Sequence, residues 1–319
     1  MALKQKDLLG LRTLTGTEID KILHTAKLMK NLLQQDKKKI SHLKGKSVIT
    51  LFYENSTRTR LSFELASKYM GSISTNISAS ASSVAKGETL VDTGKTLDRM
   101  GADIIIVRHP LAGSPHLLAK HVQARVINGG DGMNEHPTQA LLDMMTIWEK
   151  KKTITGLKVA IIGDVSHSRV ARSNIWGLTK MDNEVWVAGP STLLPPEIDK
   201  TGVSVTSKVE EAIQDADVIM GLRIQRERQR QGLFPSIREY TKYFGITSER
   251  LALAKEDAII MHPGPMNRGV EIASEAADCA ASVIEEQVTN GVAVRMALLY
   301  LMTRRRVSYE GLHTRRDAN

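Results

Sequence analysis

The chain contains one cysteine, few aromatic residues and no long apolar run. Cys279 cannot form an internal disulfide or a cysteine-based zinc site by itself, and such sparse cysteine is typical of a reducing compartment. No apolar run of about 18 residues occurs, and residues 1–30 carry charges throughout. We therefore expect an untargeted cytoplasmic protein that has no membrane partner.

Aromatic residues make up 4% of the chain, which is too little for the stacking platforms that bind single-stranded nucleic acid. The formal net charge is +9, and part of it comes from a basic C-terminal stretch, residues 304–316. Other basic residues stand singly at the ends of predicted strands, which favours small acidic substrates over nucleic acid. A polyanion-binding module is the alternative of a different class, and steep salt-dependent binding to DNA would support it.

A chain of 319 residues has room for two domains of about 150 residues each. From residue 47 onward, continuous apolar runs alternate with helical patterns, which is typical of α/β proteins whose parallel sheets are covered by helices. The expected strands are 47–53, 72–77, 103–107, 124–128, 157–164, 184–188, 203–206, 217–220 and 258–261. The expected helices are 58–70, 88–100, 114–122, 137–150, 168–180, 208–214, 247–254 and 290–305.

The segment "EKKKTITG" (149–156) interrupts this alternation with a charge run and a glycine. We therefore place a domain boundary there, between a domain of residues 1–150 and a domain that begins at residue 151. Residues 223–240, "RIQRERQRQGLFPSIREY", are polar, basic and aperiodic, and a loop of this length is uncommon unless it is functional. The broadly apolar helix at 290–305 must pack on another element.

The stretch "FYENSTRTRLSFELASKYMG" (52–71) predicts an anion site where a strand turns into a helix. Ser56, Thr57, Arg58 and Thr59 occupy the cap and first turn, where unpaired N–H groups and the helix dipole favour negative charge. An ordinary capped helix with surface arginines is the alternative interpretation. Arginine in a first turn opposes the dipole, however, so a bound anion makes this arrangement favourable.

Two further strand ends carry candidate ligands. Arg108 emerges where the buried strand at 103–107 ends, which is where open α/β sheets place binding groups. His136 and Gln139 lie at the start of the helix that begins at Pro137, and they can present a donor and an amide to a small polar ligand. A histidine that merely caps the helix is the alternative. Together these strand ends predict a site for one anionic ligand that bears a carbonyl group.

The second half of the chain repeats this pattern. The strand and turn at 160–168 lack G-x-G-x-x-G, which disfavours a nicotinamide cofactor. Arg169 lies in the helix that follows, and Arg223 and Gln225 follow another strand, so two arginines can bind two carboxylates. Ordinary salt bridges are the alternative for each arginine. The turn at Gly264–Pro265 can offer backbone carbonyls to an amino group, or it is a rigid turn in which a cis bond is possible.

These motifs together resemble the family of aspartate and ornithine carbamoyltransferases. The segments "STRTRLSFE", "KGETLVDT", "VRHP", "HPTQALLD", "RVARSN", "RIQRER" and "HPGPMNRGVEI" occur in the family's order and spacing, and the match runs from about residue 5 to residue 306. The resemblance implies two α/β lobes, with the final helix (290–306) returning to pack on the first. It also implies transfer of the carbamoyl group of carbamoyl phosphate to L-aspartate, an early step of pyrimidine synthesis, without a metal or organic cofactor.

The resemblance also implies roles for individual residues. Phosphate would be held by Ser56, Thr57, Arg58 and Thr59, and the carbonyl oxygen would be polarised by Thr59, Arg108 and His136. The carbamoyl NH₂ group would be held by Gln139 and the Gly264–Pro265 turn, and the aspartate carboxylates by Arg169 and Arg223, with Gln225 beside them. The first lobe would then be the carbamoyl phosphate-binding domain, and residues 151–289 the aspartate-binding domain.

The second lobe distinguishes the two branches of the family. Ornithine enzymes typically carry an H-C-L-P turn and a D-x-W-x-S-M-G loop, and this chain carries neither. Its turn reads H-P-G-P, with Gly264 where some members have leucine. The resemblance further implies a homotrimer with shared sites, in which Ser82 and Lys86 reach a neighbouring subunit. The sequence leaves open whether regulatory chains bind to it.

Overall fold

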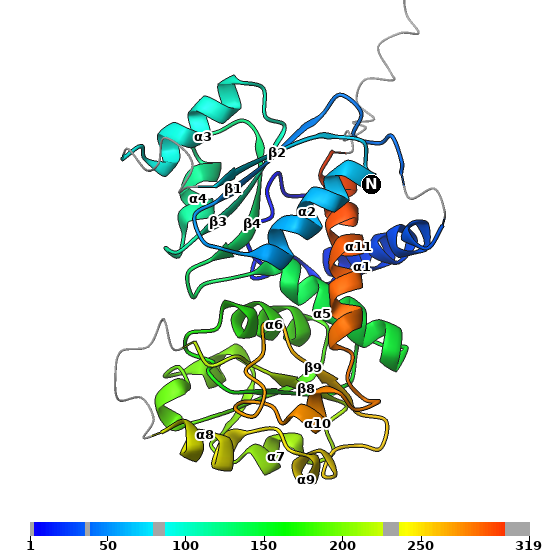
Figure 1. Ribbon diagram of the computed structural model, residues 1–319, viewed down its shortest axis with the longest axis vertical. Helices are drawn as coiled ribbons and strands as arrows, with labels where there is room; N and C mark the ends of the chain where they lie inside the picture. Colours follow the sequence, from blue (N-terminus) through cyan, green and yellow to red (C-terminus); the bar gives the residue numbers. More distant parts are fainter. Residues whose placement is uncertain (1–2, 36–38, 79–86, 226–235, 304–319) are drawn as a thin grey trace, which may run out of the picture.

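The computed structural model describes residues 3–35, 39–78, 87–225 and 236–303, which form two stacked α/β lobes (Figure 1). The first sheet has the strand order β2-β1-β3-β4 and the second has the order β7-β6-β5-β8-β9. Every strand pair in both sheets is parallel. The strands are β1 (Ser47–Phe52), β2 (Ile73–Ser78), β3 (Ile104–His109), β4 (Arg125–Asp131), β5 (Lys158–Ile162), β6 (Glu184–Ala188), β7 (Ser204–Thr206), β8 (Val218–Gly221) and β9 (Ile259–Met261).

Helices cover both sheets. Those before β5 are α1 (Gly16–Leu33), α2 (Thr57–Tyr69), α3 (Leu90–Arg99), α4 (Ser114–Ala119) and α5 (Pro137–Lys151). Those after β5 are α6 (Arg169–Lys180), α7 (Val209–Ile213), α8 (Ile237–Phe244), α9 (Ser248–Leu251), α10 (Ser274–Ala277) and α11 (Ile284–Thr303), with short 3₁₀ helices at Ser191–Leu193 and Ile198–Thr201. The predicted α/β class with two helix-covered parallel sheets is thus confirmed. No helix among the described residues is both long and apolar enough to cross a membrane.

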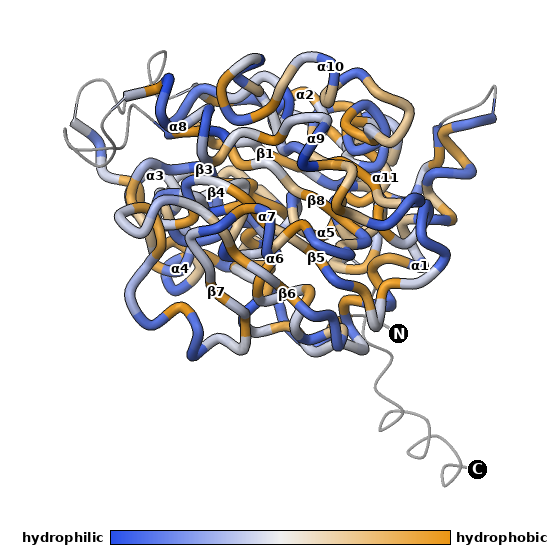
Figure 2. Tube along the Cα trace, turned by 90° about the horizontal axis from the view of Figure 1, so that it is seen from below, coloured by the Kyte–Doolittle hydropathy of each residue, from blue (hydrophilic) through white to orange (hydrophobic). Residues whose placement is uncertain are grey.

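The buried strands explain why the chain adopts parallel sheets. Residues 104–107 of β3 are fully buried, so this stretch of the strand has no polar face to turn toward water. Figure 2 shows hydrophobic segments around the central strands. The largest buried cluster continues from α5 of the first lobe to α6 of the second, and it includes Met144 and Leu178. An apolar contact between two helices therefore joins the lobes. The division at residue 150 remains a prediction.

The last helix, α11, returns to the first lobe as expected. It packs on α1, α2 and α5, and Figure 1 shows it running upward from the second lobe along these helices. It begins at Ile284, earlier than the predicted start at 290, because Glu285 and Glu286 extend its first turn. Leu298 and Leu299 on this helix are fully buried.

Three helices are absent from the prediction: α1, α8 and the short α10. The sequence analysis placed none before residue 47, yet α1 forms behind a capping box in which Thr15 and Glu18 satisfy each other's backbone N–H groups. The predicted loop at 223–240 ends earlier, because Ser236 caps α8. Tyr240 and Phe244 lie one turn apart in α8, and their rings are in contact with centroids 5.6 Å apart. The end of the 223–240 segment therefore follows a helical period and is not aperiodic loop.

Replacing Leu298 with alanine should lower the free energy of unfolding by about 2–5 kcal/mol, because a fully buried side chain of α11 leaves a cavity against the first lobe. Urea unfolding followed by circular dichroism measures this change. Val288 lies on the same helix and is 54% exposed, so Val288→Ala should change stability by no more than about 0.5 kcal/mol. Equal effects of the two substitutions would contradict the packing described here.

Candidate active site

The first turn of α2 lies at the strand-to-helix junction where the sequence predicts an anion site, and we call its residues Ser56, Thr57, Arg58 and Thr59 the anion corner. Ser56 is the N-cap residue, and its hydroxyl accepts a hydrogen bond of 3.3 Å from the backbone N–H of Thr59. Thr57 and Arg58 are exposed in the first turn, whereas Thr59 is buried. The helix therefore has its ordinary cap and also presents a guanidinium group at its positive end, where an anion would offset the repulsion.

Thr59, Arg108 and His136 meet at this corner. The Thr59 hydroxyl lies 3.4 Å from Nε2 of His136 and 3.4 Å from Nη1 of Arg108. The Arg108 Nη1 atom also donates to the Gly129 carbonyl at 3.3 Å. Three potential donors from α2, β3 and the start of α5 are thus gathered at the carboxyl edge of the first sheet, as their positions after strands predicted.

His136 is held in place by its backbone. It is the N-cap residue of α5 by position, but its side chain makes no capping hydrogen bond and is therefore not needed to cap the helix. Its backbone N–H donates to the hydroxyl of Ser173 on α6 at 2.8 Å. The buried Nδ1 atom has no partner among the described residues. Burial, reinforced by Arg108, Arg169 and Arg295, holds the pKa of His136 well below its usual value.

Glu54 joins the two lobes at this site. Its Oε2 atom lies 3.3 Å from Nε of Arg108 and 2.8 Å from Nη2 of Arg169, the first residue of α6. Arg169 is 5% exposed and also donates to the Gly132 carbonyl at 3.3 Å. The structure thus brings Arg169 of the second lobe beside the ligands of the first.

Arg223 and Gln225 lie directly after β8. Nη2 of Arg223 donates to the side-chain oxygen of Gln225 at 3.4 Å, and both side chains are partly buried. The backbone N–H of Gln225 lies 3.4 Å from Oδ2 of Asp164, which follows the adjacent strand β5. This carboxylate therefore fixes the backbone that carries the two predicted ligands.

The Gly264–Pro265 turn lies against the anion corner. Its peptide bond is cis, which the sequence analysis had allowed. Gly264 has a φ of 60°, and a side-chain carbon there would collide with the guanidinium of Arg58. The absence of a side chain at Gly264 is therefore what lets Arg58 of the first lobe approach the turn of the second.

Gln139 is buried in the first turn of α5, and its Nε2 atom donates to Oδ1 of Asp143 at 2.9 Å. Asp143 is fully buried, and burial raises its pKa to about 6. The remaining predicted ligands, Ser82 and Lys86, lie outside the described residues. Within the described part of the chain, no group of three or more histidine, cysteine or acidic side chains is placed to hold a metal.

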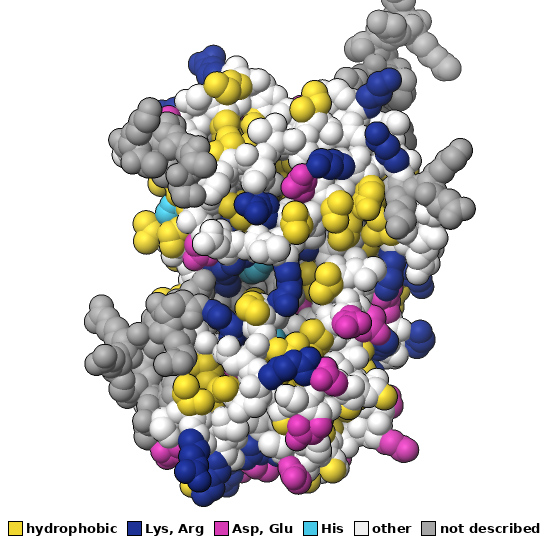
Figure 3. Space-filling view, viewed as in Figure 1, with side chains coloured by type: hydrophobic (Ala, Val, Ile, Leu, Met, Phe, Trp, Pro, Cys, Tyr) yellow, Lys and Arg dark blue, Asp and Glu magenta, His cyan; other side chains and the backbone are white. Residues whose placement is uncertain are grey.

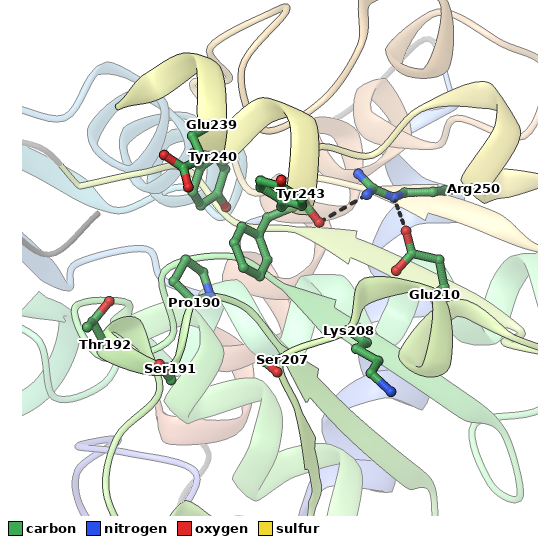
Figure 4. Close-up of a pocket in the computed structure, with 11 residues that line it drawn as sticks. Pro190, Ser191, Thr192, Ser207, Lys208, Glu210, Glu239, Tyr240, Tyr243 and Arg250 are labelled. Carbon is green, nitrogen blue, oxygen red and sulfur yellow. Dashed lines mark hydrogen bonds and ion pairs between the residues drawn. The ribbon is translucent and has the colours of Figure 1, made fainter. Parts of the chain in front are cut away.

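The space-filling view shows the surroundings of this site. Lysine, arginine and histidine side chains gather in a hollow between the two lobes (Figure 3). A cavity of about 480 Å³ lies elsewhere in the second lobe, where its lining includes Pro190 and, on α8, Tyr240 and Tyr243, and where Arg250 pairs with Glu210 (Figure 4). None of its lining residues is a predicted ligand, so this cavity is separate from the candidate site.

Sequence reasoning missed the residues that support the site. Glu54 stands four residues before Arg58 in the quoted stretch, where an acidic residue after a strand could have signalled a partner for arginine. Asp143 interrupts an otherwise apolar helix four residues after Gln139, and this spacing predicts a contact between the two side chains. Ser173, which binds the backbone of His136, and Arg295, whose charge acts on Asp143, stand in sequence contexts that predict neither contact.

Two family models cover nearly the whole chain. One, described as the carbamoyl-P binding domain of aspartate/ornithine carbamoyltransferase, matches residues 6–149. The other, described as the Asp/Orn binding domain of aspartate/ornithine carbamoyltransferase, matches residues 155–302. The chain belongs to the aspartate/ornithine carbamoyltransferase family.

Relatives within the carbamoyltransferase family include both branches. The aspartate carbamoyltransferase catalytic subunit of Ruminiclostridium cellulolyticum is 70% identical over 310 residues, which cover 97% of this chain and 99% of that protein. Aspartate transcarbamoylase from Trypanosoma cruzi in complex with N-(phosphonacetyl)-L-aspartic acid is 31% identical, with a TM-score of 0.86, and the match covers 94% of this chain and 96% of that one. Ornithine carbamoyltransferase from Pyrococcus furiosus is 33% identical, with a TM-score of 0.84, and the match covers 94% and 98% of the two chains.

The His136 ring should remain neutral across the range from about pH 6 to pH 8, because a lowered pKa means that it gains a proton only at more acidic pH. Long-range ¹⁵N–¹H correlation spectra distinguish neutral imidazole from imidazolium, and His136→Gln assigns the signal. Histidines such as His24, which is exposed, provide an internal comparison. A His136 signal that titrates near its ordinary value would contradict the burial and arginine environment described above.

Proposed function

We propose that this chain transfers the carbamoyl group of carbamoyl phosphate to the amino group of L-aspartate, which gives N-carbamoyl-L-aspartate and phosphate. The 70% identity to an aspartate carbamoyltransferase catalytic subunit supports this reaction. The observation that carries the proposal is the meeting of Thr59, Arg108 and His136: the Thr59 hydroxyl lies 3.4 Å from Arg108 and 3.4 Å from His136, at a helix start suited to phosphate.

The chemistry needs no protein nucleophile. The aspartate amine attacks the carbamoyl carbon, a C–N bond forms, the C–O bond to phosphate breaks, and the proton lost by the amine is taken up by the departing phosphate. Negative charge develops on the carbonyl oxygen, where Thr59, Arg108 and a neutral His136 supply donors that are already in place. Such preorganised donors stabilise a transition state by a few kcal/mol each, and alignment of two substrates contributes further.

The residues that would bind carbamoyl phosphate and those that would bind aspartate come mainly from different lobes. Ser56, Thr57 and Arg58 would hold the phosphate, while Gln139 and the Gly264–Pro265 turn would hold the carbamoyl nitrogen. Arg169 and Arg223, with Gln225, would bind the carboxylates of aspartate. The proposed domain division is therefore a carbamoyl phosphate-binding domain of residues 1–150 with the returning α11, and an aspartate-binding domain of residues 151–289.

A product assay tests the reaction. Purified protein receives carbamoyl phosphate with either aspartate or ornithine, and the carbamoylated product is identified by mass spectrometry. We expect N-carbamoyl-L-aspartate with aspartate and at most a trace of product with ornithine. Product from ornithine alone would move the chain to the other branch of the family, and no product from either would overturn the proposal.

Arg58→Ala and Arg223→Ala should separate the two substrates. Arg58→Ala should raise the inhibition constant of inorganic phosphate by at least about tenfold, because a charged two-pronged donor is lost. Arg223→Ala should raise KM for aspartate by at least about tenfold and leave phosphate inhibition within about twofold. Each variant is the control for the other, and equal losses for both substrates would contradict the division between lobes.

We also propose a cytoplasmic homotrimer in which Ser82 and Lys86 complete a neighbouring chain's site, and which can associate with regulatory chains. Arg58→Ala and Lys86→Ala chains should each be nearly inactive alone. After the chains are dissociated, mixed equally and reassembled, about a quarter of the sites would be intact in a head-to-tail ring. Activity near that fraction supports shared sites. No recovery, despite mixed trimers seen by native mass spectrometry, would mean that each chain completes its own site.

A further inference from the structure

Asp143 lies at the junction of three helices from both lobes. Its Oδ1 atom accepts hydrogen bonds from Nε2 of Gln139 on α5 at 2.9 Å and from Nε2 of Gln287 on α11 at 2.7 Å. Its Oδ2 atom accepts from Nδ2 of Asn174 on α6 at 2.8 Å. Gln287, Asn174 and Asp143 are all at most 3% exposed. The carboxylate is therefore part of a buried network in which each amide has one defined direction.

The first arm of this network sets the direction of Gln139. An ionised carboxylate can only accept hydrogen bonds, so Gln139 must turn its NH₂ group toward Asp143. The planar amide then presents its oxygen on the opposite edge. That oxygen is an acceptor, which suits an N–H group of a ligand and cannot bind a ligand acceptor.

The second arm reaches the Gly264–Pro265 turn. Gln287 also turns its NH₂ group toward Asp143, so its oxygen accepts the backbone N–H of His262 at 3.0 Å. His262 directly follows β9, and its Nδ1 atom accepts the backbone N–H of Gly264 at 2.9 Å. A chain of three hydrogen bonds thus connects the Asp143 carboxylate to the turn that bears Gly264.

The charge of Asp143 agrees with this arrangement. Burial raises its pKa to about 6, while Asn174, Gln287, Gln139 and Arg295 on α11 act in the opposite direction. The carboxylate is therefore mainly ionised at neutral pH. A neutral apolar side chain at this position would release both glutamine amides.

We propose that Asp143 is a positioning residue that gives the site its preference for the carbamoyl NH₂ group. It aims the Gln139 oxygen at that nitrogen, and through Gln287 it fixes the turn whose carbonyls approach the same nitrogen. This inference rests on the proposed function. It adds that specificity for an amide over a methyl group originates at the junction of α5, α6 and α11, behind the residues that touch the substrate.

Acetyl phosphate is the probe, because it keeps the phosphate and the carbonyl of carbamoyl phosphate but has a methyl group in place of NH₂. The measured quantity is the inhibition constant of acetyl phosphate divided by KM for carbamoyl phosphate, at saturating aspartate. Asp143→Leu should lower this ratio by about tenfold, since an aimed acceptor is lost. Inhibition by inorganic phosphate should stay within about twofold, because the anion corner is not altered.

Two further variants distinguish positioning from general support. Gln287→Met removes the second arm with little change of volume, and it should lower the ratio even if Asp143→Leu does not fold. Asn174→Leu is the matched control. It removes a buried donor from Oδ2 of the same carboxylate but leaves both bonds to Oδ1 intact. Since loss of this donor raises the pKa of Asp143 further, the ratio is compared at about pH 8, where the carboxylate stays ionised, and it should be unchanged there.

The outcomes are separable. A ratio that falls in Asp143→Leu or Gln287→Met, but not in Asn174→Leu, supports the proposal. An unchanged ratio in both of the first two variants, or an equal fall in all three, overturns it. A wild-type chain that forms no N-carbamoyl-L-aspartate would instead overturn the proposed function, whatever the ratios.

Discussion

The candidate site depends on one carboxylate that two arginines share. Arg108 belongs to the first lobe and Arg169 to the second, and Oε2 of Glu54 lies within 3.3 Å of both guanidinium groups. Without this anion, two poorly hydrated cations would repel each other across the junction of the lobes. Glu54 therefore allows positive charge to accumulate where two anionic substrates would bind. Burial, together with the positive charge of these arginines, lowers the pKa of His136.

Asp143 is a carboxylate of a different kind, because it is fully buried. Asp143 lies too deep to touch water, and desolvation of such a group costs several kcal/mol unless hydrogen bonds offset it. Three amide donors do so, and Arg295, whose own pKa is lowered to about 9 by burial, adds a favourable charge. An apolar residue would avoid the cost of burial, but it could not orient two amides. The burial of a charge here is explained by the direction that it imposes on its neighbours.

Much of the architecture follows from local sequence. Continuous apolar runs predicted the parallel strands, and the positions of Thr59, Arg108 and His136 at or just beyond the ends of those strands predicted their meeting, because parallel strands end at one edge of a sheet. The sequence pattern does not predict α1 and the start of α8, because the alternation of apolar runs is clear only from residue 47 and charged residues dominate 223–240. In both cases a cap, Thr15 or Ser236, was the local signal.

The supporting residues could not be predicted in the same way. Gln287 contacts Asp143 across 144 positions of sequence, and Ser173 contacts His136 across 37. Such contacts depend on how α6 and α11 pack on α5, which helical periodicity does not specify because all three helices bury apolar faces. Gly264 illustrates the same limit. Its turn was recognisable from the sequence, but the approach of Arg58 from the other lobe was not.

The two kinds of element therefore contribute different properties to the site. Strand ends and helix starts supply charge and unpaired donors, since their backbone groups lie free at one edge of each sheet. They are suited to anions, which accept hydrogen bonds from many directions. An amide nitrogen needs an acceptor at a defined angle, and a flexible glutamine supplies that only when its own amide is held from behind. The helix junction around Asp143 holds Gln139 in this way, so charge recognition arises at the sheet edges and directional recognition arises where the lobes pack together.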